Sequence, residues 1–125
     1  MAPAALQGDR RQWKDRIMAD PKSLPEVRAG IDAIDADLVR LLAERQALVR
    51  AAARFKADEQ AVRAPARVEQ VVASARERAV AAGLSPVVAE AVWRAMISAF
   101  IDLELAEQAG RATERAVNGA PRQAR

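Results

Sequence analysis

The chain has 125 residues, of which 51% are apolar, and 20 Lys plus Arg against 17 Asp plus Glu give it a net charge of +3. This length and composition predict one folded domain with a buried core, and the mild positive charge fits an anionic small ligand or weak affinity for nucleic acid. The sequence contains no Cys, His or Tyr, which excludes disulfides and thiolate metal sites and leaves acid–base chemistry to Asp, Glu, Lys and Arg.

Residues 1–23 are interpreted as an N-terminal extension. They contain a twin arginine that no apolar run follows, so we expect neither a secretory signal nor a membrane anchor. No stretch approaches the roughly 20 apolar residues that a membrane span needs. We therefore expect a cytoplasmic protein that does not bind membranes.

A long first helix is predicted from about Ser23 to about Asp58. Its apolar stripe repeats every seven residues and consists of Leu24, Val27, Ile31, Ile34, Leu38 and Leu41. Such a helix would be roughly 50 Å long, which is more than the shorter helices after it can cover. The stripe therefore predicts a partner chain along this helix, and a homodimer is the simplest such partner.

Two shorter helices follow a loop over residues 59–64. The second begins at Pro65 and ends at Gly83 as a C-terminal cap, with a buried side of Val68, Val71, Val72, Ala75 and Ala79. The third is capped by Ser85, starts at Pro86 and extends to about Gln108, with a stripe of Val92, Trp93, Met96, Ile97, Phe100 and Ile101. Residues 109–125 lose this periodicity and are expected to form a flexible C-terminal tail. The predicted fold is all-α, with three helices and no strand.

Four charged residues stand where the pattern does not favour them. Arg45 interrupts the apolar stripe of the first helix, and Lys56 follows 11 residues later on nearly the same helical face. Arg67 lies in the first turn of the second helix, where the helix dipole disfavours cations, and Glu104 continues the apolar stripe of the third.

Each of these charges has an ordinary explanation. Arg45 and Glu104 could form a buried ion pair that fixes helix register, and Lys56 and Arg67 could be solvated. Taken together, however, three cations accompany one carboxylate, and a buried excess of cations needs an anion. The expected anion is a bound carboxylate or phosphate.

Arg28 can join such a site only from another chain. It precedes Arg45 by 17 residues, which is about 25 Å along one straight helix. In an antiparallel dimer packed along the first helix, Arg28 of one chain could reach the pocket of the other.

The segments "VRAGIDAIDADLVRLLAERQALVRAAARFK", "APARVEQVV", "GLSP" and "MISAFIDLE" resemble the all-helical chorismate mutase family, especially its branch of isochorismate pyruvate lyases. The resemblance covers about residues 24–108. It implies an intertwined homodimer of three-helix chains that binds a small dicarboxylate, chorismate or isochorismate, and that needs no cofactor and no metal.

The resemblance also implies a role for each singled-out residue. Arg28 matches the arginine donated across the dimer, and Arg45 matches the in-chain arginine that holds a substrate carboxylate. Lys56 matches the lysine that hydrogen-bonds the ether oxygen and a carboxylate, and Arg67 matches a loop arginine near the second helix. Glu104 stands where most bacterial members carry glutamine.

Two departures bear on the reaction that the resemblance implies. An ether oxygen can only accept a hydrogen bond, so Glu104 must be protonated to donate one. Val68 stands where typical mutases carry a glutamate, which the lyase branch also lacks. The first expectation is the concerted rearrangement of chorismate to prephenate, driven by confinement and by cations near the ether oxygen.

Three alternatives stay open. They are an isochorismate pyruvate lyase, a 4-amino-4-deoxychorismate mutase, and a non-catalytic helical dimer that binds a partner or nucleic acid. The last has little support, because the sequence shows no recognition helix and no aromatic residues interleaved with basic ones; we expect no nucleic-acid partner.

Overall fold

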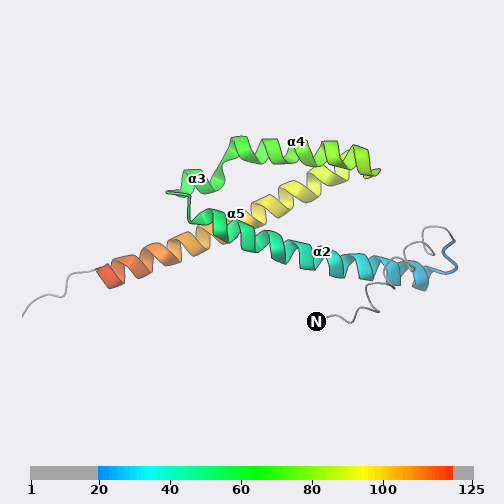
Figure 1. The fold of residues 1–125 in the computed structure, drawn as a ribbon, viewed down its shortest axis with the longest axis horizontal. Coiled ribbons are helices and arrows are strands. Elements are labelled where there is room, and N and C mark those ends of the chain that lie inside the picture. Colours follow the sequence, from blue (N-terminus) through cyan, green and yellow to red (C-terminus); the bar gives the residue numbers. More distant parts are fainter. Residues whose placement is uncertain (1–19, 120–125) are drawn as a thin grey trace, which may run out of the picture. The chain divides into compact units, whose positions relative to one another are not determined.

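The computed structural model describes residues 20–119, and every regular element in this range is a helix (Figure 1). The elements are α2 (Leu24–Ala53), α3 (Glu59–Arg63), α4 (Pro65–Ala82) and α5 (Pro86–Gly119). The predicted all-α class with three main helices is confirmed, but the third of them, α5, has 34 residues and is longer than α2, which has 30. Most of the expected N-terminal extension, residues 1–19, and the last six residues, 120–125, lie outside the described residues.

The chain divides into two compact units, one that ends at Arg45 and one that begins at Gln46. The first unit contains most of α2. The second unit contains the last turns of α2 together with α3, α4 and α5. Each unit is described by itself below.

The start of α2 agrees with the sequence, but its end does not. The Ser23 Oγ accepts a hydrogen bond from the Glu26 backbone N–H at 3.2 Å, as expected of a helix N-cap. The helix then ends at Ala53, so the predicted end at about Asp58 is wrong.

A tight turn carries the chain out of α2. The backbone N–H groups of Arg54, Phe55 and Lys56 each donate to the carbonyl three residues earlier, at 3.3, 3.0 and 3.2 Å, which is the tighter pattern of a helix end. Lys56 therefore lies beyond the helix. The prediction that it shares a helical face with Arg45 is wrong.

The segment predicted as a loop over residues 59–64 contains the short helix α3. Asp58 caps it, because its Oδ1 accepts from the Ala61 N–H at 2.8 Å. Val62 on this helix is buried, and α3 packs against α5. Ala64 joins α3 to α4 in a left-handed conformation, with φ 34° and ψ 64°.

Helix α4 packs along the first half of α5 (Figure 1). The turn between them is the one predicted, because Gly83 ends α4 with φ 79° and the Ser85 Oγ accepts from the Val88 N–H at 3.4 Å. The buried side chains between these helices are Val72, Ala75 and Ala79 from α4 and Ala89 and Ile97 from α5. Val92, which was predicted in the buried stripe, is half exposed.

Helix α5 continues to Gly119, about three turns past its predicted end at Gln108. Residues 109–119 of the expected flexible tail are therefore helical. Among the described helices, none is long and apolar enough to cross a membrane.

Candidate active site

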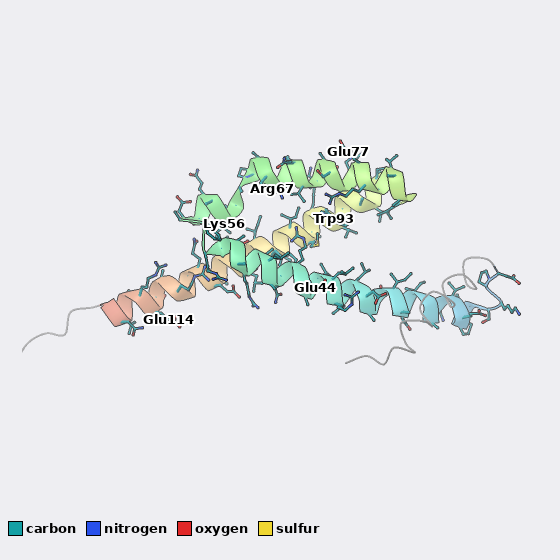
Figure 2. All side chains as sticks on the ribbon, viewed as in Figure 1. Glu44, Lys56, Arg67, Glu77, Trp93 and Glu114 are labelled. Carbon is teal, nitrogen blue, oxygen red and sulfur yellow. The ribbon has the colours of Figure 1, made fainter. Side chains whose placement is uncertain are left out.

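The centre of the candidate site is an ion pair between Lys56 and Glu104. Lys56 Nζ lies 3.1 Å from Oε1 and 3.0 Å from Oε2 of Glu104, and it donates to both. Only 5% of the Glu104 side chain is exposed, against 27% of Lys56. The pair thus joins the turn after α2, where Figure 2 labels Lys56, to the middle of α5, within one unit of the chain.

The burial of Glu104 follows from its place on α5. It lies seven residues after Ile97, on the face that also buries Ala89, so the helical repeat turns its side chain inward. A buried carboxylate without a partner is strongly unfavourable, and Lys56 supplies the compensating charge. The unusual placement of Glu104 in the sequence therefore has a structural partner, which is Lys56.

The pair retains a donor for a ligand. A lysine ammonium has three N–H groups, and two of them serve Glu104. The third can donate to an anionic or ether oxygen beside the pair. In residues 20–119, no group of three or more acidic residues is placed to hold a metal ion.

A second ion pair fixes the end of α2 against α5. Arg50 Nε donates to Glu107 Oε1 at 2.9 Å, and Arg50 Nη2 lies 2.8 Å from the same oxygen. Arg50 is one turn before the end of α2, and Glu107 is one turn after Glu104. This pair joins α2 to α5 just before the turn that carries Lys56, and we expect it to help position that lysine.

Sequence reasoning missed the Arg50–Glu107 pair. The available signal was the spacing of three residues between Glu104 and Glu107, which places two carboxylates on one side of α5. Their basic partners lie about 50 residues away in sequence, and no local pattern links such distant positions.

The structure brings together two of the five predicted site residues, Lys56 and Glu104. Arg67 is exposed near the start of α4 (Figure 2) and donates from Nη1 to Gln70 Oε1 at 2.9 Å. Arg45 is half-buried and Arg28 is exposed on α2, in the unit that ends at Arg45. The roles expected of these three arginines stay predictions.

Comparison with known proteins now places the chain. Residues 27–105 match the family model of chorismate mutase type II. The chain belongs to the chorismate mutase type II family. The resemblance seen in the sequence is thereby confirmed, and the match spans the segment that contains Arg28, Arg45, Lys56, Arg67 and Glu104.

A curated relative of this family member is the isochorismate pyruvate lyase of Pseudomonas aeruginosa. The two are 47% identical over 60 residues, which is 48% of this chain and 56% of the relative. The chain therefore spans little more than half the length of that relative. No solved structure matches the chain significantly.

Proposed function

We propose that the chain is a chorismate mutase, which rearranges chorismate to prephenate without a cofactor. The observation that carries this proposal is the buried Lys56–Glu104 pair in a chain of the chorismate mutase type II family. The pair offers a cation and a buried carboxyl group side by side, and such groups stabilise developing charge most strongly where water is excluded.

The rearrangement of chorismate needs no nucleophile and no acid–base catalyst from the protein. One C–O bond breaks while one C–C bond forms within the same molecule, so no proton, electron or leaving group passes to the enzyme. The remaining N–H of Lys56 would donate to the ether oxygen as negative charge builds there. Protonated Glu104 would donate a second hydrogen bond to the same oxygen.

Substrate confinement would come from the arginines. Arg45 and Arg28 from a second chain would hold the two carboxylates, because a guanidinium binds a carboxylate through two parallel hydrogen bonds. Holding the flexible substrate in its reactive shape lowers the entropic part of the barrier.

A homodimer is part of this proposal. Helix α2 leaves Ile31, Ile34, Leu38 and Leu41 between 47% and 51% exposed. An apolar stripe with a seven-residue repeat is typical of a helix that packs against a partner helix. A second copy of the chain would cover the stripe and deliver Arg28.

The second candidate is an isochorismate pyruvate lyase. The 47% identity to a protein of that name favours it, and so does Val68, which stands where typical mutases carry a glutamate. The same pocket would bind isochorismate and release pyruvate and salicylate.

Turnover of both substrates by the full chain separates the candidates. We expect a higher kcat/KM for chorismate than for isochorismate. A kcat/KM that favours isochorismate would replace the first candidate with the second. Turnover of neither substrate would overturn both and leave a non-catalytic binding module.

A further inference from the structure

A cavity of about 620 Å³ lies beside the Lys56–Glu104 pair. Its walls are the end of α2, the turn after it and the last part of α5, all in the unit that begins at Gln46. Sites for small molecules typically have volumes of about 300–1,000 Å³. The cavity thus has the size of a small-ligand site.

The charge of this cavity is strongly one-sided. Its lining contains Arg54, Lys56, Arg111 and Arg115 but a single acidic residue, Asp58. Asp58 already accepts the hydrogen bond that caps α3. Lys56 is neutralised by Glu104, and the three arginines of the lining outnumber its one carboxylate.

Among the residues that the structure describes, the three arginines of the lining also have no partner. Within residues 20–119, Arg54, Arg111 and Arg115 make no hydrogen bond and no ion pair. Elsewhere in the same unit, four other arginines each bind a glutamate: Arg50, Arg63, Arg76 and Arg94. Unpaired guanidinium groups thus gather at this cavity, whereas most others nearby are neutralised.

The arginines on α5 come from outside the family match. The match ends at residue 105, whereas Arg111 and Arg115 lie on the next turns of the same helix. Their spacing of four residues places both on one face, where two like charges repel each other and destabilise the helix. Ala109 and Ala112 also line the cavity. Their small side chains fill little of the space between α5 and the end of α2.

We propose that Arg54, Arg111 and Arg115 form a binding site for a small organic anion that carries two or more carboxylate or phosphate groups. Guanidinium groups bind such groups through paired hydrogen bonds, and three of them line one concave space. A nucleic acid would need an extended basic stripe, which the paired arginines nearby do not provide. Lys56 belongs to the same lining, so the bound anion would lie next to the catalytic pair.

Binding to this site does not depend on the proposed function. The test is isothermal titration calorimetry of the full chain with citrate and with inorganic pyrophosphate. Arg111→Gln and Arg115→Gln each remove one guanidinium and keep a good helix former. Arg78→Gln is the matched control, because Arg78 is an exposed helical arginine on α4 that does not line the cavity.

We expect the unaltered chain to bind at least one probe and each α5 variant to bind it about tenfold more weakly. Arg78→Gln should change the affinity less than twofold, because an exposed charge outside the cavity contributes little to binding within it. Arg54→Gln removes the guanidinium that the turn after α2 contributes to the cavity. It leaves α5 unchanged, so weaker binding in this variant cannot result from a loss of helix in α5. The proposal is overturned if neither probe binds, or if Arg78→Gln weakens binding as much as the others.

A kinetic arm identifies the source of the natural anion. If citrate inhibits chorismate turnover competitively and Arg111→Gln relieves this, the cavity receives the substrate on its way to Lys56. If citrate binds without competing, the cavity receives a separate effector. If the chain turns over no chorismate, the calorimetric result still stands and only the proposed function fails.

Discussion

Glu104 is buried, and its ionised carboxylate can accept hydrogen bonds but cannot donate them. The whole residue is 4% exposed, and its carboxylate accepts two hydrogen bonds from Lys56. An ionised carboxylate can only accept, and so can an ether oxygen, so the two cannot bond to each other unless Glu104 carries a proton. The proposed role of Glu104 thus requires its protonated form.

This requirement predicts the effect of two substitutions. Glu104→Gln should keep most of the kcat/KM for chorismate, because an amide N–H donates a hydrogen bond to the ether oxygen. Glu104→Ala removes the donor and should lower kcat/KM. A kcat/KM for Glu104→Gln as low as that of Glu104→Ala would contradict the role given to Glu104.

At the scale of elements, two left-handed residues bound α4. Gly83 ends the helix with φ 79° and Ala64 precedes it with φ 34°. A Cβ on Gly83 would meet nothing within 4 Å, so the cost of a side chain there is backbone strain alone. The conformation suits the glycine and strains the alanine.

Substitutions at these two positions should therefore have opposite signs. Gly83→Ala should lower the free energy of unfolding by about 1 kcal/mol, and Ala64→Gly should raise it by roughly 0.5 kcal/mol once the flexibility of glycine in the unfolded chain is included. Urea unfolding followed by circular dichroism measures both. Changes of the same sign would show that one of these conformations is not held in solution.

The contact between α4 and α5 includes a paired arginine and glutamate. Arg94 donates from Nη1 and Nη2 to the Glu69 carboxylate at 3.1 and 2.8 Å. These hydrogen bonds, and then the charge of Arg94, lower the pKa of Glu69. The stabilisation is present above the pKa of Glu69 in the unfolded chain and is lost as pH falls through the lower pKa of the folded chain.

Arg94→Gln should raise the pKa of Glu69 toward its ordinary value, as measured by NMR titration of the carboxyl carbon. Because the pair is exposed, added salt should also reduce the shift. Arg63→Gln is the control, since it removes an exposed pair, Arg63–Glu59, that shares no residue with Arg94. An equal pKa change in this control would show that Arg94 is not the cause.

At the scale of the whole molecule, the exposed stripe of α2 predicts a dimer. Leu38→Glu should shift the protein toward monomers in sedimentation velocity, because it places a charge in the apolar seam. Val39→Glu is the matched control: Val39 is also exposed, at 67%, but lies about 100° around the helix. A monomeric unaltered protein, or a dimer that Leu38→Glu leaves intact, would contradict the homodimer.

Local signals explain which parts of this fold were predictable. Gly83, Ser85 and Pro86 mark the α4–α5 turn in the sequence itself, and the structure follows them. The end of α2 was missed because no Gly or Pro marks it in "AAARFKADEQ". Asp58 is the local signal for this boundary, because an Asp that caps a new helix implies that the preceding helix has already ended.

The site was predictable where a charge broke an apolar pattern. Glu104 stands out in this way, and the structure buries it as the pattern indicates. Arg111 and Arg115 of the cavity were not predicted as site residues. Gly110 and the loss of apolar periodicity after residue 108 favour a flexible tail there, not a helix. A helix without an apolar stripe is hard to predict from sequence, because apolar periodicity is the main signal for a helix.

The most direct test of the account is the kcat for chorismate of Lys56→Ala beside that of Arg50→Ala. Both variants remove a cation that binds a glutamate of α5, but only Lys56 is assigned to the reacting ether oxygen. Circular dichroism should first establish that both variants keep their helices. We expect Lys56→Ala to lose at least about 100-fold in kcat and Arg50→Ala to stay within about tenfold of the unaltered protein, as its indirect positioning role implies. Equal kcat values for Lys56→Ala and the unaltered protein would contradict the account.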